Sequence, residues 1–198
     1  MNRIILIALF LFSVTSNAQT KKESEDWLVY YLNKYFDSDW NSITERSYLR
    51  EGKPYIYRSR KFMINSGKLI ITATENKKTD SNIVKSVLIS QKRTIIDLSR
   101  VTKVTQESSL TTPNSYRFYW VKIFLEFSNT DFNNLSVREF DELNNRDLTG
   151  KSYVKLFQLT SDNYDNENVV KDNFPNRLLK AFEKVAELNG AQQIKEVF

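Results

Sequence analysis

The chain has 198 residues, with 29 Lys and Arg against 24 Asp and Glu and a formal net charge of +5. It contains no Cys and no His, which excludes Cys- or His-based nucleophilic catalysis, the Ser-His-Asp triad and zinc sites built on those residue types. Its four glycines form neither a Gly-x-Gly-x-x-Gly nor a Walker sequence, so a phosphate-binding loop is excluded as well.

The first eighteen residues have the order of a secretory signal peptide. A positively charged start precedes an uncharged run over residues 4–12, and Ser16 and Ala18 supply the small residues before a cleavage site at Gln19. The uncharged run is about half of the roughly 20 residues that a membrane-spanning helix needs. We therefore expect cleavage, with no transmembrane segment left afterwards.

Residues 19–198 are expected to form a single exported α+β domain, either periplasmic or secreted. The absence of Cys favours a bacterial periplasm over a eukaryotic extracellular module. Removal of residues 1–18 leaves 28 basic against 24 acidic side chains. This mild excess is interpreted as a solvated surface with charge spread along the chain.

The first element predicted in the mature chain is a helix over residues 24–36, with Ser24 as N-cap. Apolar and aromatic side chains repeat at helical spacing, namely Trp27, Leu28, Tyr31, Leu32 and Tyr35. Trp27 and the tyrosines could form a carbohydrate-stacking platform. The spacing favours an amphipathic helix laid over a sheet.

A β-hairpin is predicted next, with strands over 55–64 and 68–74 joined by a tight Asn-Ser-Gly turn. Arg58, Arg60 and Lys61 alternate with aromatic residues, a pattern that can bind single-stranded nucleic acid. In an exported protein we interpret them as the solvent-facing side of a half-buried strand. No nucleic-acid partner is predicted.

Two more strands are predicted over 83–90 and 94–104, after a polar loop at 75–82. Four residues of the second strand are expected to face inward, with a bend or bulge after Leu98: Ile96, Leu98, Val101 and Val104. A loop is expected over 107–115. The strand over 116–127 is apolar on both faces, which places it centrally in its sheet.

The remaining chain predicts a short helix, a strand and a long helix. A polar stretch at 129–151 carries helical character over 136–143, a strand is expected over 153–159, and residues 161–172 are polar again. The last helix begins near Pro175, capped by Asn173 or Asp172, and ends before Gly190. Its apolar stripe consists of Leu178, Ala181, Phe182, Val185 and Leu188.

This order of elements resembles the pleckstrin-homology-like superfold. The similarity is carried by the stretch 94–104, the hydrophobic strand 116–127, the strand 153–159 and the helix from Pro175. It implies a strongly bent antiparallel sheet or partly open β-barrel (PH-like), with an added N-terminal helix and a capping C-terminal helix. Small exported bacterial proteins of unknown function also carry such chains. The resemblance transfers no functional residue, because the superfold hosts many unrelated binding functions.

Two groups of acidic residues are candidates for a catalytic or metal site. Glu139, Asp141 and Glu142 form one group, and Asp162, Asp165 and Glu167 form the other. Either group could supply the carboxylate pair of a glycoside hydrolase, although the spacing selects no pair. The second offers oxygen ligands for calcium but lacks the alternating acids and central Gly of an EF-hand loop. The sequence therefore predicts no catalytic residue, cofactor or metal site.

Two functions from different classes follow. The first is an exported, non-enzymatic binding or scaffolding domain of the bacterial envelope, with an envelope protein or a small ligand as partner. The alternative is a hydrolase acting outside the cytoplasm through carboxylates or a Ser–Lys pair, with Ser152 or Ser161 as candidates. The absence of His and Cys favours the binding domain.

Overall fold

The computed structural model describes residues 21–37, 51–78, 86–111, 118–127, 136–148, 156–164 and 173–192. Several predictions concern residues outside these ranges. They include the signal peptide at residues 1–18, the candidate nucleophile Ser152 and the acids Asp165 and Glu167.

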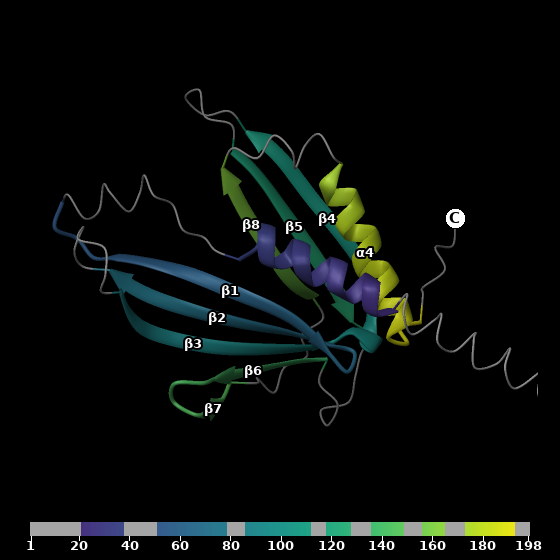
Figure 1. The fold of residues 1–198 in the computed structure, drawn as a ribbon, viewed down its shortest axis with the longest axis horizontal. Coiled ribbons are helices and arrows are strands. Elements are labelled where there is room, and N and C mark those ends of the chain that lie inside the picture. Colours follow the sequence, from purple (N-terminus) through teal and green to yellow (C-terminus); the bar gives the residue numbers. More distant parts are fainter. Residues whose placement is uncertain are drawn as a thin grey trace, which may run out of the picture.

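The described strands form two antiparallel sheets that diverge from a common corner (Figure 1). The five-stranded sheet has the order β1 (Tyr55–Asn65), β2 (Lys68–Lys78), β3 (Ser86–Asp97), β6 (Val137–Asp141) and β7 (Arg146–Asp147). The three-stranded sheet has the order β4 (Val101–Thr111), β5 (Phe118–Phe127) and β8 (Leu156–Tyr164). The predicted α+β class with antiparallel strands is confirmed, and the described strands do not close into a barrel.

The corner between the sheets is a 3₁₀ turn, η1 (Leu98–Arg100), which connects β3 to β4. Asp97 caps this turn by accepting a hydrogen bond from the Ser99 backbone N–H at 3.1 Å. The predicted bend after Leu98 is confirmed, and all four residues expected to face inward are buried. The predicted break between strands 83–90 and 94–104 is wrong, because β2 pairs along the whole of β3 and keeps residues 86–97 in one strand.

β5 lies between β4 and β8, as its two apolar faces predicted. Alternate residues of its C-terminal half are buried, namely Val121, Ile123, Leu125 and Phe127. The residue between two of them, Phe124, is half-buried. The core that they form includes side chains from both sheets and both described helices.

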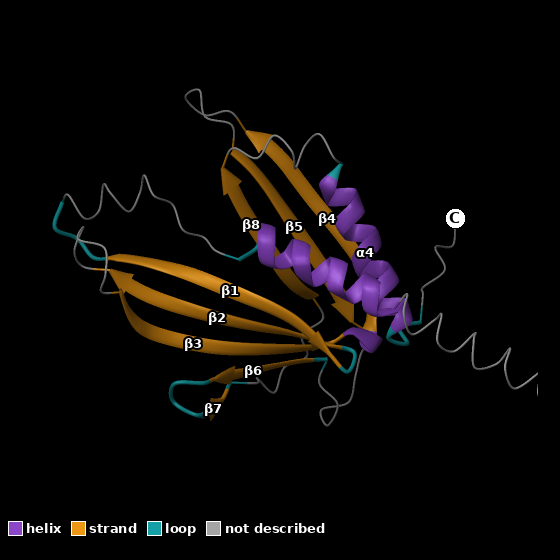
Figure 2. Ribbon diagram, in the orientation of Figure 1, coloured by secondary structure: helices purple, strands orange, loops and turns teal. Residues whose placement is uncertain are grey.

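The two α-helices in the described part of the chain are helix 21–35 and α4 (Phe174–Leu188). Figure 2 shows α4 running along β4, with helix 21–35 crossing between the two sheets. Leu178, Phe182 and Val185 of α4 are fully buried, as its predicted stripe required. Ser24 lies inside helix 21–35, so its predicted role as N-cap is wrong. Asn173 precedes α4 but makes no side-chain cap hydrogen bond.

The β1–β2 turn meets the end of α4. Ser66 and Gly67 have φ values of 50° and 74°, the two successive positive values of a type I′ hairpin turn. A Cβ at Gly67 would lie 2.9 Å from Asn189 Oδ1. The Asn189 amide donates to Glu25 Oε1 at 2.9 Å, which ties helix 21–35 to the same junction.

Helix 21–35 also covers part of the β1 edge that faces away from β2. The Asn33 side chain donates to Phe62 O at 2.8 Å and accepts from Phe62 N at 2.9 Å. Asp37 O accepts a further hydrogen bond from Arg60 N. The carboxamide of Asn33 thus makes the pair of bonds that a neighbouring strand would make.

The short helix predicted over 136–143 is wrong, because this segment contains β6. β6 pairs with Lys92–Ile96 of β3, and Val137, opposite Ile96, is buried. The pairing partner and the burial of one apolar side chain therefore override local helical character. Strands also replace predicted loops where pairing continues, at Glu75–Lys78 of β2, residues 107–111 of β4 and residues 161–164 of β8.

Candidate binding surface

The end of the five-stranded sheet farthest from the corner extends beyond both helices (Figure 1). Four large apolar side chains are exposed there. Their exposed fractions are 53% for Ile56, 62% for Val87, 41% for Leu88 and 41% for Ile89. Three of these residues, Val87, Leu88 and Ile89, are consecutive in β3.

A bulge explains how consecutive residues come to be exposed. The β2–β3 register shifts between Glu75 and Asn76, which leaves Ile89 as the extra residue. Beyond the shift, Val87 pairs with Lys77 and Leu88 pairs with Asn76. Because neighbouring residues of a strand point to opposite faces, Val87 and Leu88 place apolar side chains on both faces of the sheet.

The same part of β3 lies at an edge. β6 pairs only with Lys92–Ile96, and Gln91 O accepts the last hydrogen bond of this side, from Glu142 N at 2.8 Å. Within the described ranges, no strand pairs with Ser86–Gln91 on the side away from β2. We call Ser86–Gln91 the distal edge.

The positive charge of the chain is concentrated in this sheet. β1, β2 and β3 together carry eight Lys and Arg against two Asp and Glu, a net charge of +6, while the whole chain has +5. The expectation of a charge spread along the chain is therefore wrong. Lys92 is exposed next to the distal edge, and Lys77 lies beside Val87 on the neighbouring strand.

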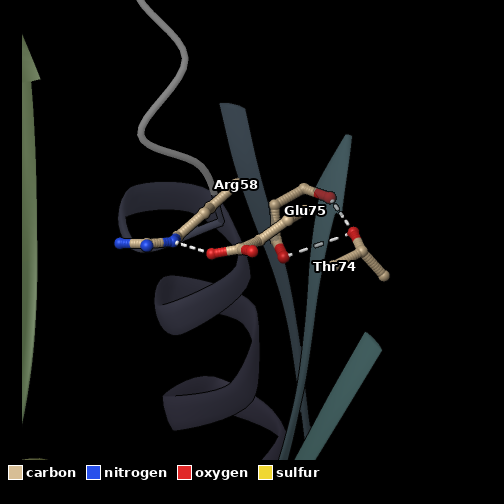
Figure 3. Close-up of polar contacts among 4 residues, drawn as sticks. Arg58, Thr74 and Glu75 are labelled. Atoms are coloured by element: carbon tan, nitrogen blue, oxygen red, sulfur yellow. Dashed lines mark hydrogen bonds and ion pairs between the residues drawn. The ribbon is translucent and has the colours of Figure 1, made fainter. Parts of the chain in front are cut away.

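Cross-strand pairs hold β1 and β2 in register beyond the core. Arg58 Nε lies 2.6 Å from Glu75 Oε1, and the Ser59 and Thr74 hydroxyls are 2.6 Å apart (Figure 3). Both are directly opposed pairs, which stabilise an antiparallel ladder by about 0.2–1 kcal/mol each. The distal part of the sheet is therefore fixed in register by polar contacts.

The basic residues considered for nucleic-acid binding do not form one surface. Arg58 and Arg60 lie on the face of β1 that also carries buried Phe62, while Lys61 lies on the opposite face. Arg58 is also engaged by Glu75. These contacts agree with the interpretation that the pattern belongs to a half-buried strand.

The aromatic residues of helix 21–35 pack against α4. Tyr35 is buried, with its ring centroid 4.4 Å from that of Phe174, and the Tyr31 and Phe174 centroids are 5.6 Å apart. The Arg177 guanidinium lies over Trp27, 5.6 Å from the ring centroid. Tyr30 is the exposed residue among these aromatics. The described rings pack against one another and against α4, so they do not form a row of exposed rings on which a sugar could stack.

The described acids of the first cluster serve the β6–β7 turn and an ion pair. Asp141 accepts from the Asn144 side chain at 2.8 Å and from the Asn144 backbone at 3.1 Å, and these two hydrogen bonds lower the pKa of its carboxyl. Glu142 Oε1 lies 2.8 Å from Arg93 Nε. A general acid needs a raised pKa, whereas the pKa of Asp141 is lowered. This shift does not suit Asp141 to the role of a general acid.

The other candidates are only partly placed. Ser161 and Asp162 lie in β8 opposite Val121 and Trp120 of β5, and their backbone is part of the sheet. Within the described part of the chain, no three Asp or Glu residues are grouped to hold a metal ion. No described helix is long and apolar enough to cross a membrane.

Sequence reasoning missed the distal edge because it treated the Val-Leu-Ile run as an ordinary strand. A run that is apolar on both faces normally indicates a strand covered on both. Here the three residues lie at an edge and are exposed. The available signal was the neutral run Ser86–Gln91 beside the basic pair Lys92 and Arg93.

Comparison with known proteins identifies no relative, since no family model, curated protein or solved structure matches this chain.

Proposed function

We propose that this chain is an exported, non-enzymatic binding or scaffolding domain of the bacterial envelope, and that it binds its partner at the distal edge. The observation that carries the proposal is the exposure of Val87, Leu88 and Ile89 on a strand with no described outer neighbour. Contiguous exposed apolar side chains and unpaired strand edges are both characteristic of interaction sites.

The proposal favours binding over catalysis on the chemistry of the described side chains. The depressed pKa of Asp141 and the ion pair of Glu142 give these acids structural roles. Without His or Cys, a hydrolase would depend on carboxylates or a Ser–Lys pair.

The pleckstrin-homology-like architecture is part of the same proposal. The order of the elements supports it, together with two antiparallel sheets meeting at η1 and a C-terminal helix along β4. The β6–β7 hairpin, which returns to the first sheet, is a departure. If α4 caps one end of the sheets, truncation before Asn173 should give an insoluble or molten product. A truncated chain that melts cooperatively would contradict the capping role.

Site-specific photo-crosslinking in the producing bacterium tests the binding surface. A benzoylphenylalanine replaces Leu88 in one strain and the exposed α4 residue Lys180 in a matched control. We expect discrete protein adducts from position 88 that are missing from position 180. Absence of adducts at position 88, or the same adducts at both positions, would contradict the proposal.

Export is tested separately by cell fractionation and mass spectrometry. The mature chain in the envelope or secreted fraction should begin at Gln19. A chain that retains Met1, or that stays in the cytoplasm, would contradict the localisation and leave the binding surface to be judged by crosslinking.

A further inference from the structure

Resting on the proposed function, we infer that the distal edge binds its partner by strand addition. The occupant is an extended segment of another protein, apolar at its centre and acidic at its flanks. It adds to the five-stranded sheet beside Ser86–Gln91, in the place that β6 takes further along β3.

The backbone of the distal edge supplies the first part of this inference. Asp97 N and Gln91 O both make hydrogen bonds on the β6 side of β3, and in an antiparallel ladder alternate residues direct their N–H and C=O groups to that side. Some backbone N–H and C=O groups of Ser86–Gln91 therefore point away from β2. A segment of about six residues, roughly 20 Å long, would match this edge.

The side chains around the edge supply the specificity. Val87 and Leu88 point to opposite faces of the sheet. Each face of an added strand would therefore lie beside one apolar side chain of β3. Lys77 lies beside Val87, and exposed Lys92 lies next to the C-terminal end of the edge. Acidic residues on both sides of an apolar centre would complement this arrangement.

A second copy of the chain is a poorer occupant. Two copies would bring together two sets of strands β1–β3, each with a net charge of +6, and like charges across an interface are unfavourable.

An anionic membrane surface would complement the charge but not the backbone. Insertion of Val87, Leu88 and Ile89 into lipid would carry an open sheet edge out of water. Unpaired backbone N–H and C=O groups cost several kcal/mol each in a hydrocarbon environment. A partner strand satisfies those groups and covers the apolar side chains at the same time.

Fluorescence anisotropy with synthetic peptides tests the inference on the purified chain of residues 19–198. The first probe is a fluorescein-labelled nonapeptide with an alternating Val/Thr centre and two Glu at each end. A second probe has Lys in place of every Glu, and a third has Pro at the central Val. We expect the first to bind at least about tenfold more tightly than the second, with a preference that weakens in high salt. The third should not bind, because proline removes a ladder hydrogen bond.

Charge reversal at the edge provides the matched variants. Lys92→Glu should reduce the preference for the acidic probe at least about threefold. Lys61→Glu makes the same charge change at an exposed position of β1 and should leave it unchanged. Circular dichroism checks that both variants fold. Equal binding of the acidic and basic probes, or equal effects of the two variants, would overturn the inference.

Two further measurements identify the competing occupants. Sedimentation that shows a dimer disrupted by Leu88→Lys, but not by Met63→Lys, would make the occupant a second copy. Binding to phosphatidylglycerol vesicles that is lost in Leu88→Lys, without binding of the acidic probe, would make it a membrane. Either result overturns strand addition. The proposed function fails separately, if position 88 yields no specific protein adduct in the cell.

Discussion

The contact between helix 21–35 and β1 can be tested by replacing one side chain. Asn33→Leu keeps a side chain of similar size but leaves the Phe62 N–H and C=O without the partners they have at 2.9 and 2.8 Å. An unsatisfied buried backbone group costs about 1–3 kcal/mol. Because Asn33 is half-buried and some water can reach the site, we expect a total loss of about 2–4 kcal/mol.

Urea denaturation followed by circular dichroism measures this loss. With a slope of about 2 kcal/mol/M, the midpoint should fall by about 1–2 M. Asn176→Leu is the matched control, because Asn176 is exposed and makes its hydrogen bonds with the side chains of Gln106 and Asn173 and not with the backbone of a strand. The control should change stability by less than about 0.5 kcal/mol. If Asn33→Leu lowered the midpoint no more than Asn176→Leu does, the Asn33 carboxamide would not be replacing the hydrogen bonds of a neighbouring strand at this edge of β1.

Three other predictions concern packing, backbone and pH. Phe182→Ala should cost about 3–5 kcal/mol because the ring is fully buried, and a calorimetric melt that hardly moves would contradict its place in the core. Gly67→Ala should be more destabilising than Gly52→Ala in chemical denaturation. Both glycines have positive φ, but of the two only a Cβ at position 67 meets another side chain within 4 Å. Equal losses of stability would mean that the turn does not pack against α4. The lowered pKa of Asp141 contributes stability above the usual Asp pKa of about 3.9, and this contribution is lost as pH falls through the folded value. Asp141→Asn should therefore lose less stability than the unmodified chain in acid urea titrations, and parallel pH profiles would show that the carboxylate is not tuned by the turn.

The elements with strong periodicity could be predicted from the sequence. The α4 stripe and the β1–β2 hairpin depend on residues within one or two turns of chain, and the central place of β5 follows from its two apolar faces. The bend at Leu98 was visible as a change in the spacing of apolar residues. In each case local chemistry and tertiary packing favour the same structure.

The remaining features depend on partners distant in sequence. Residues 137–141 have local helical character, and pairing with β3 and β7 makes them a strand. The role of Asn33 requires Phe62, which lies 29 residues away. The distal edge is defined by where β6 ceases to pair, which no local pattern encodes. The spacing of apolar residues indicates which side chains are buried. Which strand pairs at an edge depends on residues elsewhere in the chain.

The Asn33 carboxamide has a consequence for how the five-stranded sheet can be extended. A sheet with two open edges can receive a neighbour on each side and so grow into a filament. Here the Asn33 side chain occupies the β1 edge at Phe62, and Asp37 O occupies it at Arg60. A strand added at these positions of β1 would have to displace both contacts, so this part of the sheet is protected against growth by edge pairing.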